Sequence, residues 1–193
     1  MKITGGVARG IRIQAPTGTQ TRPTTDRVRE SLFGILRDWV PGARVWDLFA
    51  GSGALGLEAA SRGATEVIWV EKHGPTCGLI RQNLEKLPAA GVTAKMRVAR
   101  GDVFSWLRAE PVEVPELILA DPPYADLSDA AGLHRFLQAL ASAGCCGPET
   151  IVVLETPARL RADIPELWQC LRRETYGTTA VWLLSQDADS AVR

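Results

Sequence analysis

The tetrapeptide Asp121-Pro122-Pro123-Tyr124 is the part of this sequence whose residue types point most clearly to chemistry. It follows the apolar run Leu117–Ala120, which is typical of a buried strand, and open α/β sheets bind ligands beyond the carboxyl ends of their strands. Each proline lacks an N–H and has a fixed φ, so the strand must end there and nearby carbonyl groups can accept hydrogen bonds. Asp and Pro are also common turn residues, so an ordinary strand-ending turn stays open on this motif alone.

A glycine-rich turn is the second motif, and it lies between a predicted strand and a predicted helix. The spacing G-x-G-x-x-G is present as Gly51, Gly53 and Gly56. Glycines at this spacing let backbone N–H groups approach a nucleotide closely. Asp47 lies four residues before the first glycine, where a carboxylate suits a cationic ligand better than a pyrophosphate.

Two more acids end predicted strands. Glu71 lies 20 residues beyond Gly51, where an acid can hydrogen-bond both ribose hydroxyls of an adenosine group. Asp102 follows the third predicted strand, where a carboxylate and a backbone N–H can bind an adenine edge. A single carboxylate at a strand end is often only a surface group. Three acids after three successive strands, with the glycine turn between them, indicate a site for a nucleoside-containing cofactor.

A parallel sheet is needed to bring these residues together, and the pattern from about residue 43 onward predicts one. Short β-rich runs alternate with helical periodicity, which is typical of βαβ units. The expected parallel strands are Arg44–Phe49, Val67–Glu71, Ala94–Ala99, Leu117–Asp121 and Ile151–Glu155. Two further runs, Cys170–Tyr176 and Thr179–Leu184, are separated only by Gly177-Thr178 and predict an antiparallel hairpin. The predicted fold is therefore α/β and Rossmann-like, with a seven-stranded, mostly parallel sheet that ends in this hairpin.

The first 40 residues are expected to form a small basic extension, separate from a domain at 41–193. A glycine-rich strand or hairpin at 5–13 is followed by Arg22-Pro23-Thr24-Thr25 and then by an amphipathic helix. Residues 1–37 carry seven basic side chains against two acids, although the whole chain is neutral. This asymmetry favours an arm that faces nucleic acid, with a merely solvated surface as the alternative. We expect the extension to pack over the ligand-binding edge of the sheet.

Composition limits the class of protein. The 193 residues are 46% hydrophobic and 23% charged, which is typical of a soluble domain with a proper core. No apolar stretch is long enough to span a membrane, and the polar start is not a signal peptide. The four cysteines show no C-x-x-C pairing, so we expect reduced thiols, no metal site and a cytoplasmic location. Trp46, Trp69 and Trp182 are expected in the core, and the default oligomeric state is a monomer.

Taken in order, the motifs resemble those of class I S-adenosylmethionine-dependent methyltransferases, whose seven-stranded sheet ends in an antiparallel hairpin. The motifs are Asp47–Gly56, Glu71, Gly101-Asp102 and Asp121–Tyr124. The tetrapeptide resembles the D/N-P-P-Y/F signature of enzymes that methylate exocyclic amines of nucleobases or, occasionally, a glutamine amide. More narrowly, the chain resembles the bacterial family that methylates a guanine N2 in small-subunit (16S) ribosomal RNA. This resemblance runs from near the N-terminus to about Glu155. That resemblance is carried by Gly5-Gly6, Arg9-Gly10, Arg22–Glu30 and Asp47–Glu58.

The resemblance implies three sets of site residues. The expected catalytic residues are Asp121, Pro122 and Tyr124. The expected cofactor-binding residues are Asp47, Phe49, Ala50, Gly51, Ser52, Gly53, Glu71, Lys72, Asp102, Val103 and Asp121. The expected substrate-binding residues are Arg9, Arg12, Arg22, Thr24, Thr25, Arg27, Arg29, Pro123 and Tyr124.

The implied function is transfer of a methyl group from S-adenosylmethionine to the N2 amine of a loop guanine in 16S ribosomal RNA. The neutral net charge predicts weak binding to free RNA, so an assembled or assembling 30S particle is the expected partner. Alternatives are an adenine-N6 or glutamine-amide methyltransferase with the same tetrapeptide chemistry, and a non-catalytic RNA-binding module that keeps the fold. A nicotinamide-dependent oxidoreductase is disfavoured by the tetrapeptide and by the antiparallel ending.

Overall fold

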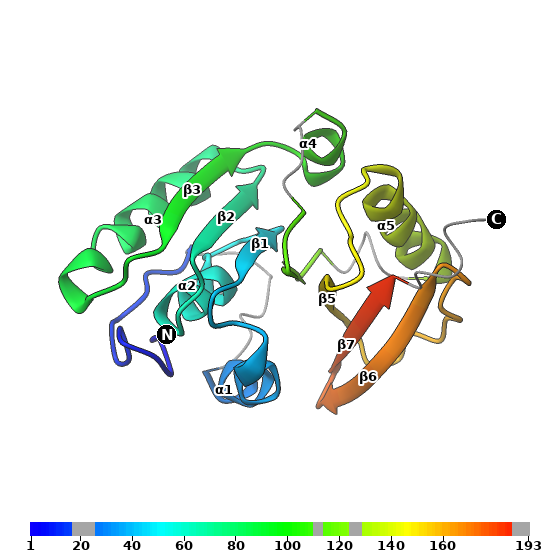
Figure 1. Cartoon of the computed structure of the whole chain (residues 1–193), viewed down its shortest axis with the longest axis horizontal. Helices are drawn as coiled ribbons and strands as arrows, with labels where there is room; N and C mark the ends of the chain where they lie inside the picture. The colour runs from blue at the N-terminus through cyan, green and yellow to red at the C-terminus, as the bar shows by residue number, and fades with distance from the viewer. Residues whose placement is uncertain (17–25, 110–113, 124–128, 187–193) are drawn as a thin grey trace. The chain divides into compact units, whose positions relative to one another are not determined.

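The computed structural model describes residues 1–16, 26–109, 114–123 and 129–186. The chain divides into two compact units, Met1–Val103 and Phe104–Arg193 (Figure 1). The helices are α1 (Asp26–Ile35), α2 (Ala54–Ser61), α3 (Gly74–Leu84), α4 (Val103–Ala109) and α5 (Ala130–Ser142), with 3-10 turns at Leu36–Asp38 and Pro88–Ala90. The strands are β1 (Arg44–Leu48), β2 (Glu66–Glu71), β3 (Lys95–Arg100), β4 (Leu117–Ala120), β5 (Ile151–Pro157), β6 (Trp168–Tyr176) and β7 (Thr179–Gln186).

The first unit is built on three parallel strands in the order β3-β2-β1. Helix α2 follows β1 and helix α3 follows β2, so the chain forms successive βαβ units (Figure 1). All eight residues of α2 are buried: seven are small or apolar and pack closely, and the eighth, Glu58, is paired with Arg29 and Arg62. Pro75 lies in the first turn of α3, where its missing N–H costs nothing. The carboxyl ends of the three strands therefore share one edge, as the sequence predicted.

The described residues before α1 form a hairpin that packs on α2 and α3. The Ile3 N–H donates to the Ile11 carbonyl at 3.0 Å. The Val7 N–H donates to the carbonyl of Ser61, the last residue of α2, at 2.8 Å. Near the end of α3, the side-chain amide of Asn83 exchanges two 2.9 Å hydrogen bonds with the backbone of Gln14. Because both helices begin at the carboxyl edge of the strands, most of this hairpin lies at their far ends. Most of the described hairpin thus lies away from the ligand-binding edge, although Met1 reaches the turn before α2 at Ser52; for the rest of the extension the expected packing stays a prediction.

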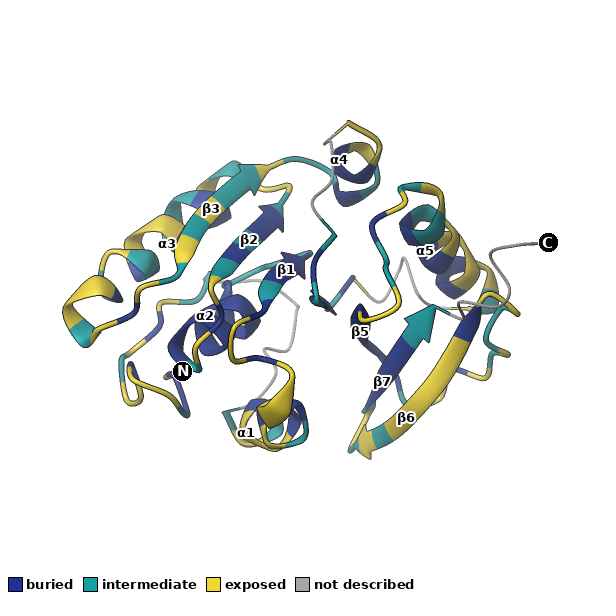
Figure 2. Ribbon diagram, viewed as in Figure 1, coloured by how far each residue is buried: buried dark blue, intermediate teal, exposed yellow. Residues whose placement is uncertain are grey.

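The second unit contains four strands in the order β4-β5-β7-β6. Strand β4 is parallel to β5, β7 is antiparallel to both β5 and β6, and the β6–β7 pair is the predicted hairpin. Every residue of β5 is buried, whereas the edge strand β6 is mostly exposed (Figure 2). Asp129 caps the start of helix α5, because its carboxylate accepts the Gly132 N–H at 2.9 Å. Its predicted apolar stripe is buried: Leu133, Phe136, Leu137 and Leu140.

All seven predicted strands occur in the structure. Their observed ends differ from the predicted ones by a few residues, most at β5 to β7, where strand pairing continues beyond the apolar runs. The division between residues 40 and 41 stays a prediction. Among the described residues, no helix has the length and apolarity that crossing a membrane requires.

Candidate active site

The turn between β1 and α2 places several backbone N–H groups at the carboxyl edge of the first unit. Phe49, Gly51 and Gly53 have positive φ angles of 59°, 52° and 76°, so the chain folds back sharply before α2 begins. A left-handed φ costs a non-glycine residue about 1 kcal/mol, so the surroundings of Phe49 must stabilise it. The Ala50 N–H donates to the Val70 carbonyl at 3.0 Å, and the Gly53 N–H donates to the Ala50 carbonyl at 2.7 Å. These bonds fix the turn against β2.

Two buried side chains on neighbouring strands, Asp47 and Trp69, support this turn. They are register partners of β1 and β2. The carboxylate of Asp47 accepts the Gly56 N–H at 2.8 Å, and the indole Nε1–H of Trp69 donates to the Gly53 carbonyl at 3.1 Å. A Cβ on Gly56 would lie 2.4 Å from Trp69 Nε1, so this position requires glycine. Sequence reasoning placed Trp69 only in the core and did not find its bond to the turn. A cofactor contact by Asp47 stays a prediction.

Glu71 ends β2 beside the same turn. One carboxylate oxygen accepts the Gly51 N–H at 2.9 Å, and the other accepts the His73 N–H at 2.7 Å. The side chain is half-buried, and each oxygen keeps a further lone pair for a hydroxyl donor. The carboxylate of Glu71 can therefore hold the glycine turn in place and, at the same time, bind ribose hydroxyls.

The end of β3 completes this edge. The Gly101 N–H donates to the Glu71 carbonyl at 3.0 Å, which aligns the two strand ends. Asp102 is half-buried, Val103 is buried where α4 begins, and Lys72 is exposed after β2. The predicted cofactor-binding residues of this unit thus share the carboxyl edge of β1, β2 and β3. Carboxylates for hydroxyl groups, together with the glycine turn beside them, fit a nucleoside-containing cofactor.

Asp121, which belongs to the second unit, follows the fully buried strand β4. It is half-buried, Pro122 is buried and Pro123 is exposed. Burial raises the pKa of Asp121 to about 6, since an ionised carboxylate loses hydration there. The group is therefore mainly ionised at neutral pH but close enough to its pKa to exchange a proton. A raised pKa of this kind is typical of functional carboxylates.

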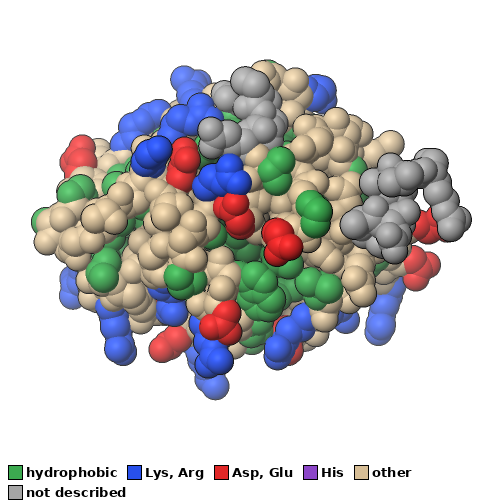
Figure 3. All heavy atoms as spheres, in the orientation of Figure 1, with side chains coloured by type: hydrophobic (Ala, Val, Ile, Leu, Met, Phe, Trp, Pro, Cys, Tyr) green, Lys and Arg blue, Asp and Glu red, His purple; other side chains and the backbone are tan. Residues whose placement is uncertain are grey.

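The predicted RNA-binding residues have different positions. Arg9, Arg12 and Arg27 are exposed. The hairpin that carries Arg9 and Arg12 packs at the far ends of α2 and α3, about 12 Å and 16 Å from their starts at 1.5 Å per residue. On the face in Figure 3, Lys and Arg side chains form several groups with acids between them, not one continuous patch. The predicted residues Arg22, Thr24, Thr25 and Tyr124 lie outside the described residues.

Arg29 requires a correction. It was expected to bind RNA, but its side chain is 0% exposed and pairs with Glu58 at 3.2 Å and Asp26 at 2.9 Å. A guanidinium held in this way cannot present its charge to a phosphate on the surface. The sequence could not separate Arg29 from the other arginines, because its partner Glu58 is 29 residues away.

Comparisons with known proteins cover nearly the whole chain. The family model described as Conserved hypothetical protein 95 matches residues 1–185. Ribosomal RNA small subunit methyltransferase D of Escherichia coli (strain K12) is 31% identical over 189 residues, which cover 97% of this chain and 91% of the relative. The Bacillus subtilis protein YlbH is 33% identical over 186 residues, covering 94% and 96%. The solved structure of Escherichia coli yhhF has a TM-score of 0.81 at 31% identity, covering 97% of this chain and 98% of that chain.

These matches extend through both units, so they test the fold of the chain as a whole. They confirm the predicted α/β, Rossmann-like class, with three parallel strands in the first unit and the antiparallel ending in the second. The motifs that bear chemistry also lie inside the matched residues. The chain therefore belongs to the Conserved hypothetical protein 95 family, the family of Ribosomal RNA small subunit methyltransferase D, and is a methyltransferase with the class I fold.

Proposed function

We propose that this chain uses S-adenosylmethionine to methylate the exocyclic N2 amine of an unpaired guanine in small-subunit (16S) ribosomal RNA. The observation that carries the proposal is a half-buried carboxylate, Asp121, followed by two prolines at the end of β4. It occurs in a chain that matches, over 97% of its length, a protein named for methylation of small-subunit ribosomal RNA. The three acids at the ends of β1, β2 and β3 support the choice of cofactor.

The amine needs help because its lone pair is delocalised into the guanine ring. The ionised Asp121 accepts one N–H of the amine, and the Pro122 carbonyl accepts the other. These bonds favour a pyramidal nitrogen and stabilise the positive charge that develops as its bond to carbon forms. The methylated nitrogen then loses a proton, and Asp121 can take it because its pKa is about 6. Tyr124 offers a face on which the base stacks.

The cofactor would be held by the edge of the first unit. Glu71 would bind the ribose hydroxyls, Asp102 would bind the adenine edge, and the turn from Phe49 to Gly53 would offer backbone N–H groups to the rest of the cofactor. When bound, S-adenosylmethionine supplies an activated methyl group on a sulfonium, so no covalent enzyme intermediate and no metal are needed. The contribution of this chain is to hold the amine in line with that methyl group.

The RNA would be bound through phosphates and by extrusion of the target base. The amine must be unpaired to reach Asp121, and A-form RNA hides base edges, so a loop guanine is the expected target. Arg9, Arg12 and Arg27 are the described candidates for phosphate contacts. The net charge of zero gives little general attraction to RNA, so we propose a 30S particle as substrate and a cytoplasmic monomer as the enzyme.

The test is methyl transfer from labelled S-adenosylmethionine to four substrates: naked 16S RNA, the 30S particle, DNA and a release-factor protein. We expect labelled N2-methylguanosine in the RNA, with faster turnover on the particle than on naked RNA. Mass spectrometry of digested RNA identifies the modified base, and Asp121→Asn is the control, which should lose about 100-fold in rate. Transfer only to adenine or to a glutamine amide would replace the proposal with those chemistries. Cofactor binding without transfer to any substrate would favour a non-catalytic module.

A further inference from the structure

Besides the N-terminal 37 residues, a second segment of the first unit is strongly basic. Residues 72–100, which contain α3 and β3, carry six basic side chains and one acid, although the whole chain is neutral. The basic residues are Lys72, Arg81, Lys86, Lys95, Arg97 and Arg100, and the acid is Glu85. All of them are exposed except Lys86, which is half-buried. Because the segment lies within one compact unit, these side chains have defined positions relative to one another.

The basic side chains line the edge strand β3. This strand is the first in the sheet order and pairs with β2 on one side. Lys95, Arg97 and Arg100 are its exposed residues. From α3, a terminal nitrogen of Arg81 donates to the Val98 carbonyl at 3.3 Å, so this guanidinium lies against the strand. At about 3.3 Å per residue, the distance from Lys95 to Arg100 along β3 is about 17 Å.

The line of charge continues at both ends of β3. Helix α3 ends where β3 begins, and there the Nζ of Lys86 donates to the carbonyl of Arg12 in the hairpin at 3.1 Å. At the other end, Arg100 is the register partner of Glu71, so the line reaches the cofactor edge. We call these seven side chains the basic row: Arg12, Lys72, Arg81, Lys86, Lys95, Arg97 and Arg100. The position of the hairpin far from the cofactor edge thus gives Arg12 a place at the start of the row.

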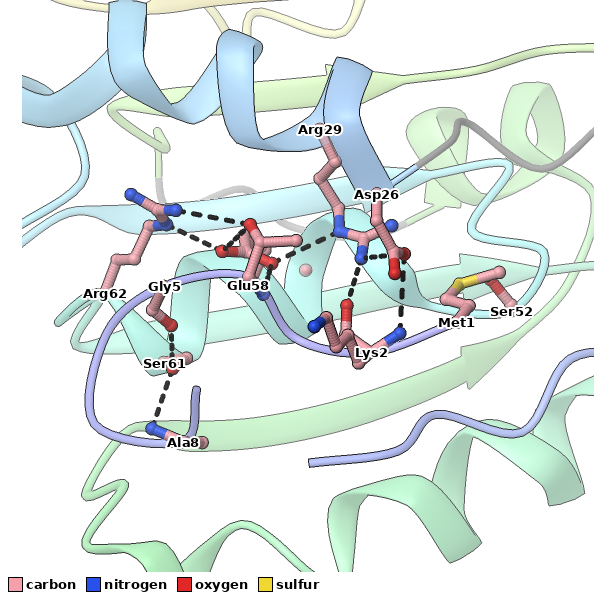
Figure 4. A network of polar contacts seen from close by, with 12 residues as sticks. Met1, Lys2, Gly5, Ala8, Asp26, Arg29, Ser52, Glu58, Ser61 and Arg62 are labelled. Atoms are coloured by element: carbon pink, nitrogen blue, oxygen red, sulfur yellow. Dashed lines mark hydrogen bonds and ion pairs between the residues drawn. The ribbon is translucent and has the colours of Figure 1, made fainter. Parts of the chain in front are cut away.

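The hairpin that carries Arg12 is held firmly on the first unit. In Figure 4, the Oγ of Ser61 in α2 accepts the Ala8 N–H at 2.9 Å and donates to the Gly5 carbonyl at 2.6 Å. Arg12 therefore has a fixed position relative to α3 and β3. A surface that is ordered before its ligand arrives loses less conformational entropy on binding.

The charge of the row is not neutralised within the protein. Across the described part of the chain, Arg81, Lys95 and Arg100 form no ion pair. The edge strand of the second unit, β6, is different, because Arg172 pairs there with Glu174 at 2.8 Å. Charges of either sign keep an edge strand from pairing with another chain. A row of one sign that extends beyond its strand instead fits a polyanion.

We propose that the basic row binds the phosphate backbone of ribosomal RNA at nucleotides away from the methylated base. This inference rests on the proposed function, because it concerns the same RNA substrate. Lysine and arginine contacts to phosphates release counterions and orient the RNA without reading its sequence. The row therefore contributes to RNA affinity and leaves cofactor binding and the chemical step to the residues at the strand ends.

The experiment compares the wild type with Arg81→Gln/Lys95→Gln, which removes two charges of the row away from the cofactor edge. The matched control is Arg37→Gln/Arg172→Gln, which removes two exposed charges that each pair with an acid. The Kd for 16S RNA is measured by filter binding at several salt concentrations. The kcat on the 30S particle, cofactor Kd by calorimetry and folding by thermal melting complete the comparison.

We expect Arg81→Gln/Lys95→Gln to weaken RNA binding about fivefold or more and to lower the slope of log Kd against log salt by about 1.4–1.8, the effect of two lost phosphate contacts. Its kcat and cofactor Kd should stay within about twofold of the wild type. The control should bind RNA as the wild type does. A second variant, Arg81→Lys/Lys95→Arg, keeps both charges and should also bind RNA normally, whereas a purely structural role of Arg81 would weaken binding there too.

A folded Arg81→Gln/Lys95→Gln protein with unchanged RNA affinity and salt slope would overturn the inference and leave the proposed function standing. Equal weakening by the control would also overturn it, since only the net charge would then matter. Weakened binding by the charge-keeping variant would have the same consequence. Methyl transfer by the wild type to DNA or protein alone would instead overturn the proposed function, and the separate measurement of RNA binding distinguishes that result from a failure of the row.

Discussion

Near the start of α2, the indole of Trp69 occupies the space that a side chain on Gly56 would need, because a Cβ there would lie 2.4 Å from the indole nitrogen. The same nitrogen donates to the Gly53 carbonyl at 3.1 Å. A residue of the β2 core thus determines how closely the first turn of α2 approaches the sheet. The backbone N–H groups of the cofactor turn precede that helix directly, so their positions depend on this packing.

Gly56→Ala should therefore damage both stability and cofactor binding. The added methyl group displaces the indole or the helix, which we expect to lower the free energy of unfolding by about 1–3 kcal/mol. Cofactor Kd should rise about tenfold, measured by calorimetry beside chemical denaturation. Gly78→Ala is the matched control, because a Cβ there meets nothing within 4 Å and alanine favours a helix. Adding Trp69→Phe to Gly56→Ala should recover part of both losses, and independent effects of the two changes would contradict this account.

The rate of methyl transfer should depend on pH through Asp121. Its carboxylate accepts the amine N–H only when ionised, and burial raises its pKa to about 6. We expect the rate with saturating RNA and cofactor to be constant above pH 7 and to fall about tenfold per pH unit well below 6. Asp121→Asn should be slow and lack this inflection. A wild-type rate that stays constant down to pH 5 would show that ionisation of Asp121 is not required.

Ionisation of Asp121 should raise the rate of methyl transfer but lower the free energy of unfolding. The pKa of Asp121 is about 6 in the folded chain against a reference value of 3.8, so the folded chain holds this proton more tightly. The cost of ionisation is absent at low pH, grows between about pH 4 and 6, and reaches about 3 kcal/mol above that range. Asp121→Asn should thus exceed the wild type in free energy of unfolding, by more at pH 8 than at pH 5. Urea denaturation at both pH values measures the difference, and a variant less stable than the wild type at pH 8 would refute it.

The elements that carry the site were predictable because their signals are local. An apolar run followed by Glu71 or Asp121 indicates both a buried strand and its polar end. Gly177 adopts a positive φ of 61° between β6 and β7, and its place between two β-rich runs predicted the hairpin. Such features need only neighbouring residues, so the sequence contains them directly.

The internal contacts of the site could not be predicted because their partners are distant in sequence. The bond from Thr4 to Glu58 spans 54 residues, and the bond from Trp69 to Gly53 spans 16. Neither follows from periodicity, since each depends on which helix packs on which segment. Arg29 illustrates the consequence: a basic stretch predicted a surface charge, but the side chain is buried and pairs with Glu58.

Glu71 should be necessary for cofactor binding, and its own strand offers the control. Replacing it with alanine removes the acceptor of the Gly51 and His73 N–H groups as well as the proposed acceptor of the ribose hydroxyls. Hydrogen bonds to a charged group contribute about 1.5–3 kcal/mol each, so cofactor Kd should rise at least tenfold. Glu66→Ala changes the same residue type at the opposite end of β2 and should leave Kd within about twofold. Calorimetric titration of S-adenosylmethionine into both variants provides the measurement, and equal Kd values would exclude Glu71 from the cofactor site.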